Sequence, residues 1–169
     1  TKGPVHWHAD FEIYNCGKIV NLADPEGLSN REGSAVFHEH NDDRIHVEGV
    51  VTSYEDISLN EFFEVVGGYL SKEIIIVPTN EEDLEIKNGD LCNGKEGKLQ
   101  VFLYKIINPD KNVYKQEKLD EFTDYVLSPY SLVPPGDCII IEFSEEKDKT
   151  DNICETYKVA LKKGELSGN

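Results

Sequence analysis

Histidines are the residues of this chain best suited to chemistry, and all five lie within its first 46 positions. His6 and His8 form one His-x-His pair, His38 and His40 form a second, and His46 follows closely. Side chains two residues apart on a β-strand point to the same face, so each pair can offer two imidazoles to one ion. Imidazole is a common ligand of zinc and copper near neutral pH. The spacing therefore predicts a copper or zinc site at these five residues.

Two carboxylates accompany the histidines. Asp10 has the same strand parity as His6 and His8, and Glu48 lies two residues beyond His46. Each is a candidate metal ligand, or the carboxylate that orients a ligating imidazole. A catalytic centre would also need an open coordination position and a nearby base, and no motif indicates a substrate. We therefore expect metal binding rather than catalysis, and assign no catalytic residue.

A strand must position the first pair, because "VHWHADFEI" (residues 5–13) alternates in polarity. One parity is apolar and predicts a core face. The other parity carries the histidines, and we expect it to be free of core packing. The apolar positions are Trp7, Ala9, Phe11 and Ile13, and the polar ones are His6, His8, Asp10 and Glu12.

A hairpin is expected to position the other three histidines. "AVFHEH" and "IHVEGVV" read as strands, with the turn "NDDR" between them. An even-numbered loop would place Glu39 opposite His46 and leave the pair elsewhere. An odd-numbered loop or a bulge would bring His46 together with His38 and His40. The sequence leaves both registers open.

The rest of the chain indicates an α+β fold with about seven strands in mixed or antiparallel sheets and two short helices. Residues 58–68 predict a helix with a Ser58–Glu61 capping box and a stop at Gly67. A second short helix is expected within residues 117–127. Strands are predicted at residues 73–78, 98–106, 136–143 and 153–161, with a Pro-Gly turn at 134–136.

Domain organisation is open between two descriptions. A weak internal similarity suggests two related hairpin-plus-helix halves, a histidine-rich half at residues 1–80 and a second β-rich half at residues 81–169. The alternative is a single domain spanning residues 1–169.

Charge and cysteine content limit the partners and the compartment. The chain has 33 acidic and 17 basic residues, and its net charge of −16 argues against binding to nucleic acid or to an anionic membrane surface. Four cysteines without a CxxC pair predict two disulfides in one of three connectivities. With no methionine in the chain, we expect an exported protein at the cell surface or outside it, tethered to a membrane through a removed N-terminal segment.

Several segments resemble an uncharacterised family of exported or membrane-anchored bacterial and archaeal domains. They are "HWHADFEIYNCGKIV", "FHEHNDDRIHVEGV", "SLNEFFEVVG" and "KLQVFLYKI", against family motifs HWHAH, HTHD and IHIE. The resemblance covers roughly residues 5–70 and, more loosely, 98–107. It implies a cell-surface setting and a metal at the histidines. Asp10, Glu39 and Asn41 depart from the family motifs, which leaves the choice of metal open.

Two other functions fit the same residues. The chain could be a structural subunit of a surface layer or filament, a homo-oligomer in which "TKGPV" pairs with a neighbour's sheet and metal lies at subunit contacts. It could also be a cupin-like metalloenzyme, since His6, His8, Glu12 and Gly17 loosely match a cupin motif. A cupin motif follows several strands of its barrel, however, whereas this one opens the chain.

Overall fold

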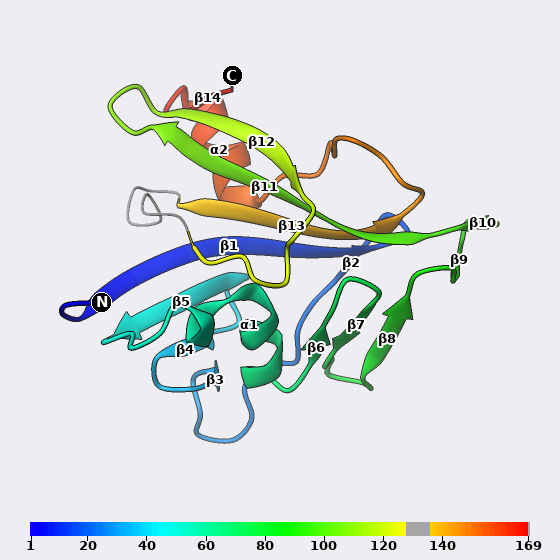
Figure 1. Ribbon diagram of the computed structural model, residues 1–169, viewed down its shortest axis with the longest axis horizontal. Coiled ribbons are helices and arrows are strands. Elements are labelled where there is room, and N and C mark those ends of the chain that lie inside the picture. The colour runs from blue at the N-terminus through cyan, green and yellow to red at the C-terminus, as the bar shows by residue number, and fades with distance from the viewer. Residues whose placement is uncertain (128–135, 169) are drawn as a thin grey trace.

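The computed structural model describes residues 1–127 and 136–168. Its main feature is a nine-stranded sheet with the order β14-β12-β11-β13-β1-β5-β4-β3, in which β2 also pairs with β1 (Figure 1). A three-stranded sheet (β6-β7-β8) and the short β9–β10 pair lie beside it. The described residues thus form a sheet-dominated structure with two helices, compatible with the α+β class. The predicted Pro-Gly turn lies mostly outside them.

The elements have the following bounds. The helices are α1 (Leu59–Val65) and α2 (Glu155–Lys163), with a 3₁₀ turn η1 (Glu55–Ile57). The strands are β1 (Val5–Asn15), β2 (Lys18–Val20), β3 (Glu32–Gly33), β4 (Phe37–Glu39), β5 (Arg44–Gly49), β6 (Tyr69–Leu70), β7 (Ile74–Val77), β8 (Leu84–Lys87), β9 (Leu91–Cys92), β10 (Lys95–Glu96), β11 (Lys98–Asn108), β12 (Val113–Leu119), β13 (Asp137–Ser144) and β14 (Ser167–Gly168). The expected number of about seven strands was too low, because many of the fourteen strands in the described residues are two- to four-residue pieces that carry little sequence pattern.

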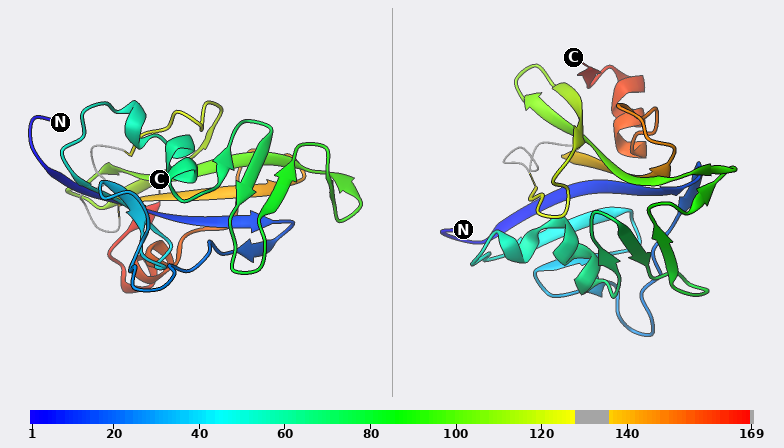
Figure 2. Two further views of the ribbon diagram at one scale, coloured as in Figure 1. Left: turned by 90° about the horizontal axis from the view of Figure 1, so that it is seen from below. Right: turned by 45° about the vertical axis from the view of Figure 1, so that its right-hand side comes forward.

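The large sheet has a hydrophobic core on each face. Figure 2 shows α1 and α2 on opposite faces of the sheet. Phe62 of α1 packs against Phe11 of β1, with ring centroids 5.2 Å apart. On the other face, Tyr157 of α2 packs in a second cluster with Phe102 and Ile140. Alternate residues of the central strands therefore contribute to different cores.

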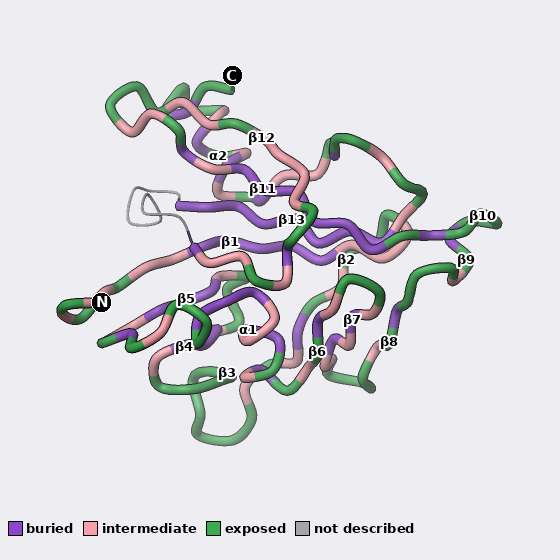
Figure 3. The backbone as a smooth tube through the Cα atoms, viewed as in Figure 1, coloured by how far each residue is buried: buried purple, intermediate pink, exposed green. Residues whose placement is uncertain are grey.

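Strand β13 joins the two ends of the chain. It pairs in parallel with β1 and antiparallel with β11, so strands from both halves of the sequence lie in one sheet. Its residues from Asp137 to Phe143 are all buried, so the strand predicted here is covered on both faces (Figure 3).

The predicted final strand at residues 153–161 is wrong, because this segment forms helix α2. Its apolar residues fit both the two-residue period of a strand and the 3.6-residue period of a helix. Tyr157 and Ala160 fall three residues apart and are buried as one side of a helix. Gly164 ends the helix in the left-handed conformation, with φ 72°. The disulfide between Cys154 and Cys138 attaches the start of this helix to β13.

The predicted helix at residues 117–127 is also wrong. Its first residues extend β12, which ends at Leu119. The carbonyls of Thr123 and Tyr125 instead accept hydrogen bonds from the amides of Asn60 and Leu59, each at 2.9 Å. These are among the first amides of α1, which have no partner within their own helix.

Helix α1 itself is confirmed, but the predicted capping box is absent. Ser58 makes no side-chain capping bond. Its hydroxyl donates to the carbonyl of Glu55 and to the side chain of Asn60. Gly67, with φ 88°, lies in the left-handed region just beyond the helix, as expected.

Two disulfides are present, as predicted, and they select one of the three connectivities. Cys16 bonds to Cys92, and Cys138 bonds to Cys154, with Cα–Cα distances of 5.4 and 5.8 Å. Such bonds persist in oxidising compartments, so they indicate an extracytoplasmic environment. Among the described helices, none has the length and apolar character needed to cross a membrane.

Candidate metal centre

Three adjacent strands bring the five histidines together. β5 lies between β1 and β4 in the sheet. His8 on β1 is directly opposite His46 on β5, and His46 is directly opposite His38 on β4. Residues paired across neighbouring strands have side chains on the same face. The three imidazoles therefore form a row across the sheet, with His6 and His40 beside its two ends.

The loop between β4 and β5 is responsible for this row. Pairing of His38 with His46 leaves seven intervening residues, which is the odd-numbered register of the two left open by the sequence. Asn41 and Asp43 adopt positive φ in the turn. The Glu39 carboxylate accepts hydrogen bonds from the amides of Asp42 and Asp43, which holds the turn closed.

The β1 pair lies at the exposed end of the row. The rings of His6 and His8 have centroids 4.5 Å apart. Nε2 of His6 lies 2.9 Å from a carboxylate oxygen of Glu48, its partner in register on β5. Glu48 is thus placed to orient the His6 ring, which is one of the two roles predicted for it.

The β4 pair is deeper. His38 has 0% exposure, whereas His40 is partly exposed. Their ring centroids are 4.7 Å apart, and Nδ1 of His40 lies 2.5 Å from the carbonyl oxygen of Asn30. Strand β3 pairs closely with β4, with Gly33 opposite His38, and this close approach requires a residue without a side chain at position 33. A Cβ there would lie 2.7 Å from the Phe37 carbonyl oxygen and 3.1 Å from the Cα of His38.

His46 connects the two pairs. Its ring centroid is 4.7 Å from that of His8 and 4.8 Å from that of His40. It is 8% exposed, and its Nε2 lies 3.3 Å from a carboxylate oxygen of Asp42. The candidate ligand atoms fall into two groups, each with its atoms within 4.8 Å of one another. They are His6, His8 and His46, and His38, His40 and His46.

Three ring nitrogens in this row are buried and have no hydrogen-bond partner among the described residues. They are Nδ1 and Nε2 of His38 and Nδ1 of His46. A buried polar group without a partner costs about 1–3 kcal/mol. In a neutral imidazole, one nitrogen is a lone-pair acceptor, which is also the form that ligates a metal. A bound ion would provide the partner that the protein itself does not.

Two of the imidazoles, those of His8 and His38, have lowered pKa values. Burial, together with the neighbouring His46, His6 and Arg44, lowers the pKa of His8 from 6.5 to about 4. Burial and the neighbouring His40 likewise lower the pKa of His38. Both side chains are therefore unprotonated at neutral pH, as metal ligation requires.

Asp10, also predicted as a metal residue, has other partners. Its carboxylate is 4% exposed, pairs with Nε of Arg44 at 2.6 Å, and accepts a hydrogen bond from the hydroxyl of Thr156 on α2. Burial raises the pKa of Asp10, while Arg44 and Thr156 oppose that shift. Asp10 belongs to neither three-histidine group.

Helix α2 explains why the polar face of β1 is not free of packing along its whole length. The polar face of β1 was expected to be free of core packing. This is true of His6, which is exposed, but Asp10 and Glu12 are buried. Glu12, the carboxylate of the cupin-like set, accepts hydrogen bonds from the Glu155 amide at 3.1 Å and from the Tyr14 hydroxyl at 2.5 Å. The alternation of β1 placed these carboxylates correctly, but the helix that covers them was predicted as a strand.

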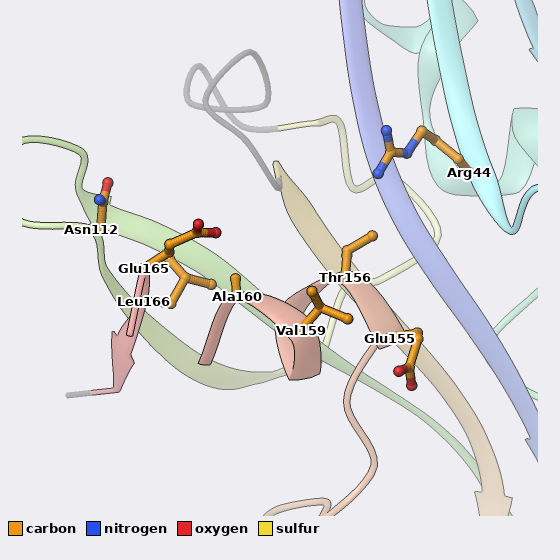
Figure 4. A pocket seen from close by; sticks show the side chains of 8 residues that line it. All are labelled: Arg44, Asn112, Glu155, Thr156, Val159, Ala160, Glu165 and Leu166. Carbon is orange, nitrogen blue, oxygen red and sulfur yellow. The ribbon is translucent and has the colours of Figure 1, made fainter. Parts of the chain in front are cut away.

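A pocket of about 540 Å³ extends from Arg44 along α2. Figure 4 shows Arg44 arriving from β5, with Thr156 and Val159 of α2 facing the same space (Figure 4). Because Arg44 precedes His46 by two positions on β5, the two side chains share a face of the strand, and this pocket adjoins the metal centre.

Sequence reasoning missed three groups that contact this centre. Asp42 approaches His46, the Asn30 carbonyl approaches His40, and Arg44 pairs with Asp10 and helps to lower the pKa of His8. Asp42 could have been suspected from its place in the turn four residues before His46. The contact from Asn30 had no signal, because it depends on how a long loop folds back.

Comparisons with family models, with curated proteins and with solved structures found no match to this chain. The interpretation of the centre therefore depends on the chemistry and geometry of its own residues.

Proposed function

We propose that this protein binds a transition-metal ion, copper or zinc, through its clustered histidines. The observation that carries the proposal is the row His8–His46–His38, in which three buried ring nitrogens lack a partner among the described residues. A row of imidazoles with few competing hydrogen bonds suits the borderline ions copper and zinc. Calcium prefers carboxylate and carbonyl oxygens.

Binding, rather than catalysis, is the role we assign. The carboxylates nearest the histidines are already engaged: Glu39 holds the turn, Glu48 contacts His6, and Asp10 pairs with Arg44. A group that holds structure in this way is poorly placed to shuttle protons for a reaction.

The setting we propose is outside the cytoplasm, at the cell surface or in the extracellular space. The two disulfides support an oxidising compartment. The resemblance of residues 5–70 to exported or membrane-anchored domains supports the same location, including a membrane tether through an N-terminal segment.

Titration of the purified protein with copper, zinc and calcium at pH 7 and pH 5 tests this function. We expect copper or zinc to bind tightly at pH 7, with calcium ineffective. Because protons compete for imidazoles and the pKa of His8 lies near 4 rather than 6.5, binding should weaken only modestly at pH 5. Calcium binding that survives at pH 5 would instead assign the ion to carboxylates, and absence of any binding would refute the proposal.

A triple variant with a matched control makes the test specific. His6→Ala/His8→Ala/His40→Ala removes only exposed or partly exposed side chains and leaves each group with at most two histidines. We expect it to lose tight binding. Glu85→Ala/Lys87→Ala/Lys95→Ala replaces exposed side chains on strands of other sheets, two of them with the same i, i+2 spacing, and should bind as wild type.

A further inference from the structure

The two three-histidine groups share one residue, and that residue lies between the others. His46 is on β5, with the His6–His8 pair of β1 to one side. On the other side lie His38 of β4 and His40, which directly follows that strand. His38 and His46 are stacked, with interplanar angle 1° and centroids 5.4 Å apart. The ring of His46 therefore occupies the middle of the row.

One ion cannot use both outer pairs in this arrangement. Neighbouring strands are about 4.8 Å apart, so β1 and β4 are separated by about 10 Å with β5 between them. Zinc–nitrogen bonds are about 2.0–2.1 Å long, which requires ligands to converge on a point within that reach. The point midway between the outer pairs is filled by His46 itself. Among the described residues, no group joins the two pairs.

Resting on the proposed function, we propose that the centre holds two transition-metal ions, with the imidazole of His46 bridging them. One ion takes His6, His8 and a nitrogen of His46, and the other takes His38, His40 and the second nitrogen of His46. Nδ1 of His46 is buried without a partner, and its Nε2 has only a 3.3 Å contact with Asp42. Neither nitrogen is held by a strong competing bond.

The bridge requires one proton to leave. A neutral imidazole carries one N–H, so both nitrogens can ligate only when that proton passes to solvent as the second ion binds. No electron is transferred in this step. The carboxylates of Asp42 and Glu48 lie beside the centre and offset the charge of two cations.

The two positions differ in exposure, which predicts an order of filling. The β4 group contains fully buried His38, whose two nitrogens both lack partners, whereas the β1 group contains exposed His6. The β4 position gains more from ligation, so it fills first and exchanges more slowly. The β1 position faces solvent and takes the second ion.

Copper(II) titration of the whole chain tests the bridge, using native mass spectrometry for stoichiometry and electron paramagnetic resonance for coupling. We expect two ions per chain. The first equivalent should give an isolated copper spectrum, and the second should weaken that signal, because an imidazolate couples the two spins. Proton release should be greater for the second ion than for the first.

Two variants separate the positions. His6→Ala/His8→Ala and His40→Ala should each bind one ion with an isolated spectrum, and neither replaces the fully buried His38. A single ion in wild type, lost in either variant, would overturn the two-ion inference while leaving metal binding intact. Two ions with additive, uncoupled spectra would overturn the bridge. Failure of wild type to bind copper or zinc at all would instead refute the proposed function.

Discussion

His38 and His46 lie face to face on neighbouring strands, with their rings parallel to within 1° and no side-chain partner for three of their four nitrogens among the described residues. A protein interior seldom leaves such groups unpaired. These unpaired nitrogens should destabilise the metal-free protein, and a bound ion should remove that cost. Replacing either side chain should therefore change the free energy of unfolding differently with and without metal.

We expect His38→Leu to reduce stabilisation by metal, because one of the two three-histidine groups loses a ligand, while leaving the metal-free protein at least as stable as wild type. The variant removes two buried nitrogens without partners, and the gain should be about 1 kcal/mol after the change in packing. Denaturant unfolding with a chelator, and again with zinc, measures both effects. His6→Leu, at an exposed site, is the control and should give no gain with chelator. A loss of several kcal/mol for His38→Leu under those conditions would contradict the prediction.

The metal-free protein should lose stability as the pH falls from about 6.5 to about 4. The pKa of His8 is lowered to about 4 and that of His38 is also lowered, whereas both titrate near 6.5 in the unfolded chain. In this window the unfolded chain binds more protons than the folded one, so acid favours unfolding. Urea unfolding of chelated protein across this range checks the slope. His8→Gln should reduce the slope, and an equal slope in that variant would exclude His8 as its source.

Asp10→Asn should keep the metal stoichiometry of wild type, because Asp10 is bound to Arg44 and Thr156 rather than placed in a histidine group. Arg44→Met should cost about 3 kcal/mol of stability, since it leaves a buried carboxylate without its cation. The double variant Asp10→Asn/Arg44→Met should recover much of that loss. Metal analysis and chemical denaturation of the three proteins measure these effects. If the Asp10→Asn variant bound fewer ions than wild type, Asp10 would have to be counted as a metal ligand.

Peptide mapping without reductant should find Cys16 joined to Cys92 and Cys138 joined to Cys154. The cysteines of each pair are 76 and 16 residues apart. Loop-closure entropy then predicts that replacing the first pair with alanine costs about 4–5 kcal/mol and replacing the second about 3 kcal/mol. Thermal or denaturant unfolding of the two double variants gives the comparison. A different pairing, or four alkylated thiols in natively produced protein, would contradict both the connectivity and the oxidising compartment.

Local patterns were sufficient to predict several helices and strands, and to select all five histidines as candidate metal ligands. The alternation of residues 5–13 predicted β1, and the spacing of Leu59, Phe62, Phe63 and Val66 predicted α1. Both signals are local, since the period of apolar residues reports which side of one element is buried. Cysteine number likewise predicted two disulfides, but not their pairing.

Competing local signals explain the second helix. In residues 153–161, strand-like alternation and a helical spacing of Tyr157 and Ala160 coexist, so nine residues could not separate the two periods. The Lys162–Gly164 ending, with two cations before a left-handed glycine, was the evidence for a helix that the strand interpretation passed over.

Only the tertiary structure decided how the histidines meet. The sequence determined that His6 and His8 share a face, as residues two apart on a strand must. That His46 lies between the two pairs depends on the order β1-β5-β4 and on the seven residues between His38 and His46 in the β4–β5 register. The burial of Asp10 depends on α2, which is more than 140 residues away in the chain. Pairings of this kind are set by long-range packing, and a one-residue change of register would have turned His46 to the opposite face.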